Sequence, residues 1–114
     1  VDCNRDYPAL LPDVAREWAR IDREYHVPYF PHISIGWDNN PRYTKLVRPV
    51  MTGSCPENFK KGLLMAKTYV DTHDLPAPLI TLNSWNEWTE MSYLEPDDVF
   101  GYGYLEAVQA VFGV

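Results

Sequence analysis

The chain has 114 residues, of which 46% are hydrophobic and 23% are charged, and its formal net charge is −6. This is the composition of a folded globular protein, and it excludes intrinsic disorder and collagen-like repeats. No apolar run approaches the roughly 18 residues of a membrane span. The sequence contains no basic segment followed by an apolar stretch, so we expect no signal peptide in it. The length predicts a single unit, residues 1–114, and leaves the compartment open.

Charge is unevenly distributed along the chain. Residues 1–67 contain ten Lys and Arg against eight Asp and Glu, whereas residues 68–114 contain eight acidic residues and no Lys or Arg. An acidic, aromatic-rich surface repels phosphate backbones, so we expect no nucleic-acid partner. Neutral polar ligands such as sugars suit this surface, although a merely solvated acidic face explains the charge equally well.

The two cysteines, Cys3 and Cys55, are isolated from each other in the sequence. Neither belongs to a CxxC pair, and no paired histidines stand nearby, so we expect no zinc site. A disulfide and two buried free thiols both remain open. We also expect no cofactor, since no motif for one is present.

The pattern predicts three helices and two strands in the order α-β-α-β-α. Apolar residues at i, i+4, i+7 and i+11 predict a first helix over residues 12–25, with Pro12 in its first turn. Ser54 and Glu57 have the spacing of a capping box, which predicts a second helix over 56–73. A third helix is predicted over 103–112. The first apolar stripe consists of Val14, Trp18, Ile21 and Tyr25, with Trp18 expected in the core.

Residues 32–36 and 79–85 are predicted strands, rich in β-branched and aliphatic residues. A helix between two strands calls for a right-handed parallel crossover, so we expect the strands to be parallel neighbours. Neither strand is polar along one face, which predicts a sheet covered on both sides. His32 is accordingly expected to be a core histidine.

The loops that leave the strands, at residues 37–54 and 86–102, are long, and those that enter them are short. Barrels of the (β/α)8 type and doubly wound sheets have this arrangement, with their sites at the carboxyl ends of the strands. No glycine-rich phosphate loop follows either strand, which weighs against nucleotide binding. Two strands cannot close a barrel. The chain is therefore expected to need either the missing part of a larger barrel or a second copy of itself, with Val14, Phe59 and Leu63 left uncovered without one.

Chemistry-bearing residues concentrate at the end of the second predicted strand. If Thr81 and Asn83 point inward, strict alternation brings Trp85 and Glu87 inward as well, and Glu90 follows three residues later. Two carboxyl groups beside aromatic rings are typical of glycosidic bond cleavage, one held protonated and one ionised. The alternative is a solvated acidic loop whose Trp residues belong to the core.

Within this pair we expect Glu90 to be the acid, with its proton held by desolvation among Trp88, Met91 and Tyr93. We expect Glu87 to lie deeper and to stay ionised through a hydrogen bond from an asparagine. Residues 38–41 also form strong turn chemistry, so Arg42 has the alternative of pairing only with Asp38. The candidate substrate-contacting residues are Trp37, Asp38 and Arg42 on the first loop and Asn83, Trp85, Asn86, Trp88, Tyr93 and Glu95 on the second.

The strings ISIGWDNNPR, LITLNSWNEWTEMSYLEPD and GYGYLEAV resemble the WbsX-like family and its relatives around glycoside hydrolase family 99. The resemblance covers residues 29–112 and implies the C-terminal portion of a (β/α)8 barrel of parallel strands. The two glutamates of the hydrolases' N-E-W-x-E motif, which are catalytic there, align with Glu87 and Glu90. The resemblance implies that the first activates the sugar's own 2-hydroxyl and that the second protonates the leaving oxygen. The chain departs from the hydrolases at Thr89, where they have His, and at Met91, where they have Gly.

These features are consistent with three functions. The first is a retaining, endo-acting glycoside hydrolase that acts on an oligo- or polysaccharide. The second is a glycosyltransferase of surface-polysaccharide synthesis on the same barrel, which would need a nucleotide- or lipid-linked sugar donor. The third is a carbohydrate-binding domain without catalysis, which would bind sugar without Glu87 and Glu90.

Overall fold

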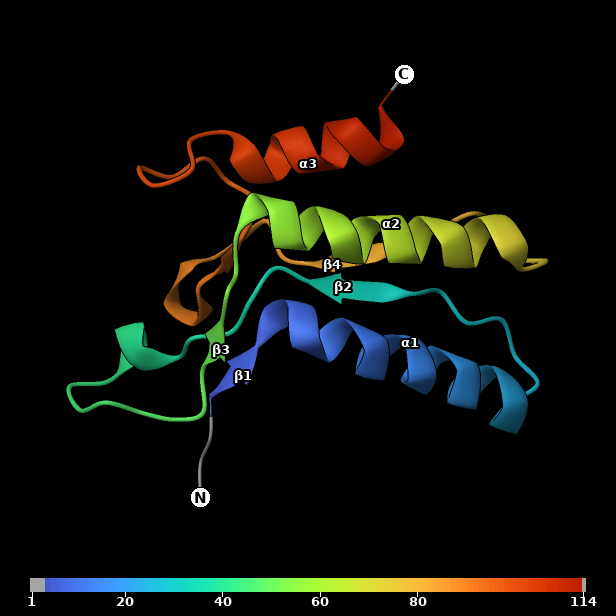
Figure 1. Ribbon diagram of the computed structural model, residues 1–114, viewed down its shortest axis with the longest axis horizontal. Helices are drawn as coiled ribbons and strands as arrows, with labels where there is room; N and C mark the ends of the chain where they lie inside the picture. Colours follow the sequence, from blue (N-terminus) through green and yellow to red (C-terminus); the bar gives the residue numbers. More distant parts are fainter. Residues whose placement is uncertain (1–3, 114) are drawn as a thin grey trace.

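The computed structural model describes residues 4–113 and is of the mixed α/β class, as predicted (Figure 1). Two 3₁₀ turns, at 40–42 and 88–90, lie in the long loops. The helices of the described residues are α1 (Tyr7–Glu24), α2 (Pro56–Thr72) and α3 (Gly103–Phe112). The strands are β1 (Arg5–Asp6), β2 (His32–Ser34), β3 (Met51–Thr52), β4 (Thr81–Asn83), β5 (Asn86–Glu87) and β6 (Ser92–Tyr93).

Strands β2 and β4 form a parallel pair, joined through α2. His32 lies opposite Thr81, and Ser34 lies opposite Asn83. This confirms the prediction that the two strands are parallel neighbours with their carboxyl ends at one edge. A second parallel pair, β1 with β3, and an antiparallel hairpin, β5 with β6, were not predicted because each strand has only two residues.

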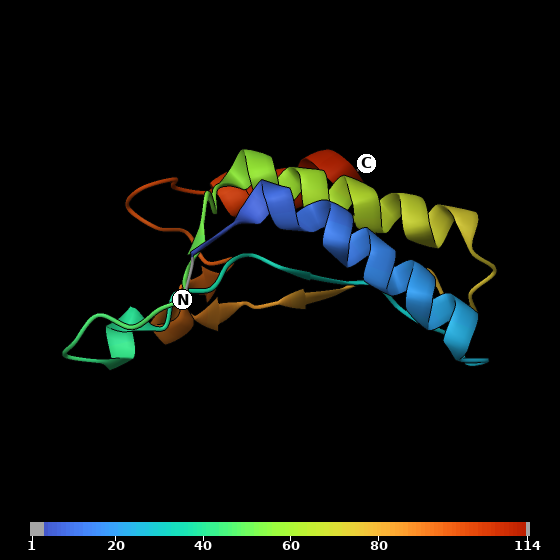
Figure 2. The same cartoon turned by 60° about the horizontal axis from the view of Figure 1, so that its bottom comes forward.

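The helices lie on one side of the β2–β4 pair, and the described residues leave the other side bare (Figure 2). Ile33 and Ile35 are buried toward the helices. His32 and Thr81 are exposed, and their side chains meet, Nδ1 to Oγ1, at 2.8 Å. The predictions of a doubly covered sheet and of a core His32 are therefore wrong for the described residues, because polar and apolar residues alternate along both strands.

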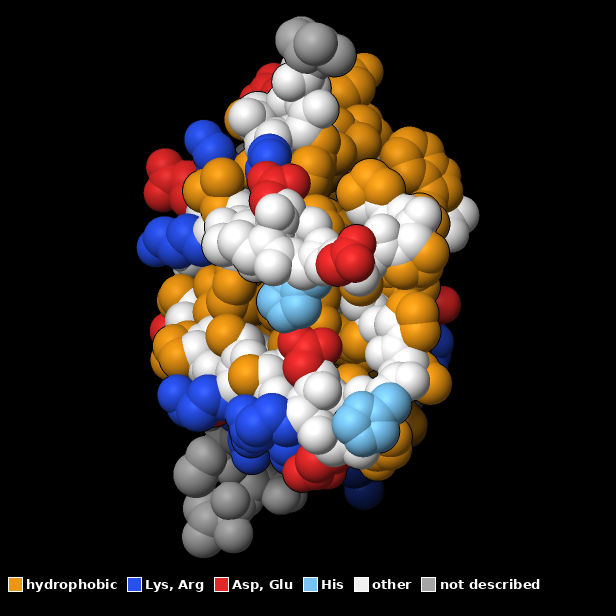
Figure 3. All heavy atoms as spheres, turned by 90° about the vertical axis from the view of Figure 1, so that its right-hand side faces the viewer, with side chains coloured by type: hydrophobic (Ala, Val, Ile, Leu, Met, Phe, Trp, Pro, Cys, Tyr) orange, Lys and Arg blue, Asp and Glu red, His pale blue; other side chains and the backbone are white. Residues whose placement is uncertain are grey.

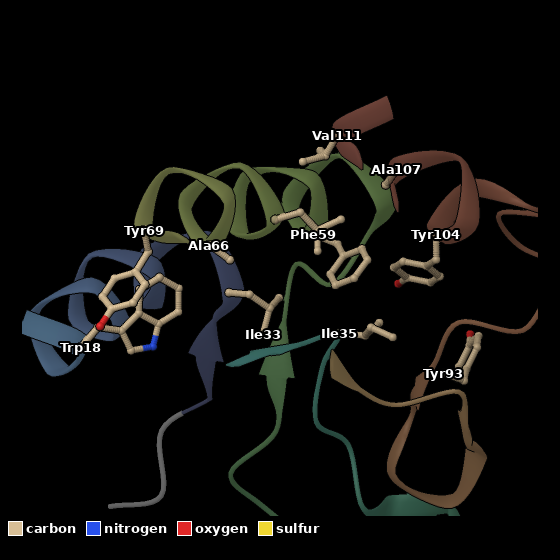
Figure 4. Close-up of a cluster of buried hydrophobic side chains, with 11 residues drawn as sticks. Trp18, Ile33, Ile35, Phe59, Ala66, Tyr69, Tyr93, Tyr104, Ala107 and Val111 are labelled. Atoms are coloured by element: carbon tan, nitrogen blue, oxygen red, sulfur yellow. The ribbon is translucent and has the colours of Figure 1, made fainter. Parts of the chain in front are cut away.

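The core lies between the strand pair, α2 and α3 (Figure 4). Phe59 and Leu63 are fully buried, and the rings of Phe59 and Tyr104 meet edge to face at a centroid distance of 5.7 Å. The expectation that Phe59 and Leu63 stay uncovered is wrong, because α3 packs against α2 and closes that side. Trp18 is buried, as predicted, and its ring meets Tyr69 edge to face.

Two helix starts differ from prediction. Helix α1 begins at Tyr7, so Pro12 lies inside the helix and Pro8 occupies its first turn. Tyr7 explains the early start, since it is buried and its hydroxyl donates to the Ser34 carbonyl at 2.7 Å. The predicted capping box of α2 is absent: Cys55 is the N-cap residue and no side chain caps the helix. Cys55 is a free thiol, whereas Cys3 lies outside the described residues.

A polar cluster ties the far ends of α1 and α2 together. His73 Nδ1 lies 2.7 Å from the Tyr69 carbonyl oxygen, and its Nε2 lies 2.8 Å from Asp22 Oδ2. The His73 ring stacks on the Tyr69 ring at 3.7 Å, and the Tyr69 hydroxyl donates to Asp22. Figure 3 shows histidine and acidic side chains gathered at this end of the molecule, away from the long loops.

The described chain is flat and broad, with extents of 46 × 38 × 20 Å and a radius of gyration of 15.1 Å. A compact domain of this length has a radius of gyration near 13 Å. Large apolar side chains are exposed on several elements, among them Val27, Leu46 and Leu79. Within residues 4–113, no helix combines the length and the apolar character needed to cross a membrane.

The neighbours Leu63 and Leu64 test this packing. Leu63 is 0% exposed and Leu64 is 46% exposed on the outer side of the same helix. We expect Leu63→Ala to lower the free energy of unfolding by about 2–5 kcal/mol, because it leaves a cavity in the core. We expect Leu64→Ala to change it by less than about 1 kcal/mol. Thermal or urea denaturation measures both, and equal losses would contradict the packing.

Candidate functional site

The two long loops meet at the edge where β2 and β4 end, as parallel strands require. The Asp38 amide donates to the Glu90 carbonyl at 2.9 Å and so joins the loops through the main chain. The Met51 amide donates to the Trp37 carbonyl at 2.7 Å, which closes the first loop on itself. The candidate residues of both loops therefore lie on one end of the molecule.

One arginine holds both candidate glutamates. A terminal nitrogen of Arg42 lies 3.1 Å from Glu87 Oε1, and the other lies 3.1 Å from Glu90 Oε1. Arg42 lies in the loop after β2 and the glutamates lie in the loop after β4, so these contacts connect the two loops. Arg42 does not pair with Asp38, whose Oδ1 accepts hydrogen bonds from the Asn40 amide and side chain instead.

Thr89 completes this cluster. Its hydroxyl donates to Glu87 Oε1 at 2.7 Å and accepts from Arg42 Nε at 2.9 Å. The hydrogen bond from Thr89, together with the charge of Arg42, lowers the pKa of the Glu87 carboxyl below its ordinary value of 4.5. Glu87 is thus held ionised, as expected, but by Thr89 and Arg42 and not by an asparagine. Asn83 instead donates to Ser92 at 3.1 Å.

A buried serine fixes the hairpin that carries the glutamates. Ser92 is fully buried, and its hydroxyl donates to the Asn83 carbonyl at 2.7 Å. The Ser84 hydroxyl donates to the Ser92 carbonyl at 2.8 Å and accepts from the Glu87 amide at 3.2 Å. These hydroxyl groups connect the end of β4 to the main chain of Glu87, a role that hydrophobic periodicity gives no means of predicting.

Met91 closes the tight turn of this hairpin in the left-handed region, with φ at 52°. Glycine is the residue that adopts this conformation without steric cost. The hydrolases that this sequence resembles have Gly at the position of Met91. Met91 therefore adopts the backbone conformation that a glycine would favour at this position.

A second group of candidates forms an aromatic stack within the second long loop. The rings of Trp88 and Tyr93 stack at 3.9 Å, and Trp88 Nε1 donates to Glu95 Oε2 at 3.0 Å. The Tyr93 hydroxyl donates to Asp97 Oδ2 at 2.7 Å, and burial raises the pKa of that hydroxyl above its ordinary value. Glu95 therefore holds Trp88 in place.

A cavity of about 310 Å³ opens between the long loops and the start of α3. It contains Trp37, Asp38 and Tyr93 from the candidate list, but neither Glu87 nor Glu90. Its other lining residues, none of which was among the predicted substrate-contacting residues, are Met51, Gly53, Ser54, Met91, Val99, Phe100 and Tyr104. The signal available for them was only their position in or beside the two long loops.

Several details of the predicted site differ from the structure. Glu87 and Glu90 do not line the cavity that Trp37 and Asp38 line, and both of their carboxyl groups contact Arg42. Glu87 is also the shallower of the two: its side chain is 42% exposed and that of Glu90 is 20% exposed. Among the described residues, Trp85 and Asn86 are exposed and neither side chain contacts a glutamate through a hydrogen bond.

Metal ligands do not gather at this site. Within the part of the chain that the structure describes, no three His, Cys, Asp or Glu side chains lie close enough together to hold a metal ion.

The family comparison agrees with the motifs of these loops. The family model described as glycosyltransferase WbsX matches residues 5–108. The chain belongs to the WbsX family. This is a family of carbohydrate-active enzymes, and the match includes Arg42, Glu87 and Glu90.

Two curated relatives of the WbsX-family chain come from two strains of Xanthomonas campestris pv. campestris and carry the name uncharacterized protein WxcX. Each is 36% identical to it over 84 residues, which is 70% of this chain and 12% of the relative. The chain thus spans about an eighth of the length of these relatives. No solved structure matches the chain significantly.

The hydrogen bond from Thr89 can be tested by titration. We expect Thr89→Val to raise the pKa of Glu87 toward 4.5, because the variant removes the strongest cause of the lowered value. A carbon-13 NMR titration of the Glu87 carboxyl measures it, with exposed Thr44→Val as the control. Because the folded-state pKa is lowered, the ionised carboxyl stabilises the fold above its ordinary pKa, and this contribution is lost as the pH falls. An unchanged Glu87 pKa in Thr89→Val would contradict the assignment.

Proposed function

We propose that this WbsX-family chain supplies the two catalytic carboxyl groups of an enzyme that cleaves glycosidic bonds in an oligo- or polysaccharide. The observation that carries the proposal is that Glu87 and Glu90 both contact Arg42 at the carboxyl end of β4. Glycoside hydrolysis typically uses two carboxyl groups that flank the same glycosidic bond. The carbohydrate-active family supports the substrate class.

The environments of the two glutamates favour different roles. Glu87 accepts hydrogen bonds from Thr89 and Arg42, which keep it ionised, so it suits the part of base or nucleophile. Glu90 is the more enclosed of the two and accepts no hydrogen bond from Thr89. We assign Glu90 the part of acid, which protonates the leaving oxygen and then activates water.

Arg42 has to change partners for this chemistry. A guanidinium 3.1 Å from Glu90 stabilises the carboxylate, and an acid needs its proton. We infer that Arg42 turns to the hydroxyl groups of the bound sugar and so frees Glu90 to take up a proton. Arg42 would then contact the substrate directly, together with Trp37, Asp38 and the aromatic stack of Trp88 and Tyr93.

The chain is proposed to be the C-terminal portion of a (β/α)8 barrel. The bare side of the β2–β4 pair, the exposed apolar side chains and the large radius of gyration of 15.1 Å support this. In such a barrel, β2 and β4 would be the last two strands, and α3 would be the last helix. The bare side, with His32, Ser34, Thr81 and Asn83, would face the interior.

A glycosyltransferase is the second candidate, and the family's description favours it. The same two carboxyl groups could then activate an acceptor hydroxyl and not water. Such an enzyme needs a sugar donor with a phosphate leaving group, and Arg42 is the cation nearest the glutamates that could contact it.

Replacement of the two glutamates tests the proposal in the full-length protein. We expect Glu87→Gln and Glu90→Gln each to lower kcat about 10²–10⁴-fold while sugar binding is kept, since each loses a proton-transfer group. Glu95→Gln should lower it less, because Glu95 supports Trp88 through one hydrogen bond. Exposed Glu106→Gln is the matched control. Near wild-type turnover in both the Glu87 and Glu90 variants would overturn the proposal.

The choice between hydrolase and transferase needs a second measurement. A hydrolase releases new reducing ends from a glycan in water alone, and chromatography of the products detects them. A transferase extends an acceptor only when a nucleotide- or lipid-linked sugar is supplied. Sugar binding that survives Glu87→Gln and Glu90→Gln with no turnover in the wild type under either condition would favour a binding domain without catalysis.

A further inference from the structure

The cavity beside the glutamates has the walls of a ligand site. Its sides are formed by aromatic rings and by Met51, Met91 and Val99. Trp37, Met91 and Phe100 at its margin are exposed, although they are large apolar side chains. A concave surface with exposed apolar side chains around a few polar groups is the usual form of a small-molecule site. The volume of about 310 Å³ accommodates one sugar ring with its bound water.

Ser54 provides an independent observation. It lines the cavity, and its Oγ is buried without a hydrogen-bond partner among the described residues. A buried hydroxyl without a partner costs free energy, so such groups are rare in native proteins. Ser54 does not cap α2, although it precedes that helix. Because no protein group holds this hydroxyl, rotation about the Cα–Cβ bond of Ser54 would turn it toward a ligand oxygen in the cavity.

Ser54 packs directly against the backbone of Gly36. A Cβ on Gly36 would lie 2.6 Å from Ser54 Oγ and 3.4 Å from the Met91 carbonyl oxygen. The absence of a side chain at Gly36 therefore leaves room for the serine hydroxyl between the two long loops. Asp38 adds a carboxylate to the same cavity, with one oxygen engaged by Asn40.

The charge of the cavity selects among ligands. Asp38 lines it and Asp97 lies just behind Tyr93, whereas no Lys or Arg is among its lining residues. A phosphate or a carboxylate would be repelled here. Aromatic faces, a carboxylate and a free hydroxyl together suit a neutral ring with several hydroxyl groups, which stacks on one face and hydrogen-bonds at its edge.

We propose that this cavity is a second sugar-binding subsite, which holds a neutral pyranose unit of the glycan away from the bond that reacts. The inference rests on the proposed function for its ligand class. The subsite contains neither Glu87 nor Glu90. The main-chain hydrogen bond from Asp38 to Glu90 connects it to the carboxylate pair. The subsite would bind and orient a long substrate without touching the reacting atoms.

Ligand-observed NMR of the full-length protein tests the subsite, with methyl glucoside, methyl galactoside and methyl mannoside as probes. We expect at least one of them to bind and Phe100→Ala to weaken that binding about tenfold or more, since it removes a stacking wall. Phe112→Ala is the matched control, because both phenylalanines are 40% exposed and Phe112 lies outside the cavity. We expect Ser54→Ala to weaken binding about three- to tenfold without lowering the melting temperature, since the hydroxyl has no protein partner.

Three results would overturn the subsite: no binding of any of the three probes, binding that Phe100→Ala and Ser54→Ala leave unchanged, or tighter binding of glucose 1-phosphate or glucosamine than of the neutral sugars. Glu87→Gln and Glu90→Gln separate this outcome from failure of the proposed function. They should leave methyl glycoside binding intact while they abolish turnover. Probe binding with unaffected turnover in those variants would keep the subsite and reject the catalytic roles.

Discussion

The packing of α2 against β2 sets the geometry on which the site depends. Gly62 permits it, because a Cβ there would lie 3.1 Å from the Tyr7 hydroxyl and 3.3 Å from Ile33 Cγ2. With α2 this close, Phe59 and Leu63 fill the space above the sheet, and β4 can return parallel to β2. Parallel strands deliver both long loops to one edge, and only then can Arg42 reach Glu87 and Glu90.

The site itself is held by polar contacts and not by a hydrophobic core. Ser92 is the one polar residue buried in full among the described residues, and it joins the end of β4 to the hairpin. Arg42 then connects that hairpin to the other loop through two carboxylates. Contacts of this kind are directional, so they fix the glutamates in place while both side chains stay open to solvent.

Regular features of the fold could be predicted from the sequence, and irregular ones could not. Helix α3 and the parallel pairing of β2 with β4 were predicted because periodicity and short return loops report them directly. The start of α1 was placed too late, since Tyr7 belongs to the helix through a tertiary contact with Ser34. The predicted capping role of Ser54 was wrong, because no side chain caps α2. The predicted burial of His32 was wrong, because polar and apolar residues alternate along both strands and the polar side lies away from the helices.

The candidate site divides in the same way. The sequence motif identified Glu87 and Glu90 as a pair, and their closeness follows from residue spacing. The partnership with Arg42 joins residues 45 positions apart, and nothing local selects it over the turn at Asp38. The cavity likewise gathers side chains from both loops and α3, so only the fold brings Ser54 and Phe100 together.

The hydrogen bond from the Asp38 amide to the Glu90 carbonyl has a thermodynamic consequence. Asp38 lines the cavity, and Glu90 belongs to the carboxylate pair, so displacement of either residue strains the other. Ligands at the two places would then share a coupling free energy, and linkage makes that coupling reciprocal. A sugar unit in the cavity would therefore change the affinity for a ligand at the glutamates by a certain factor. That ligand would change the affinity of the cavity for the sugar by the same factor.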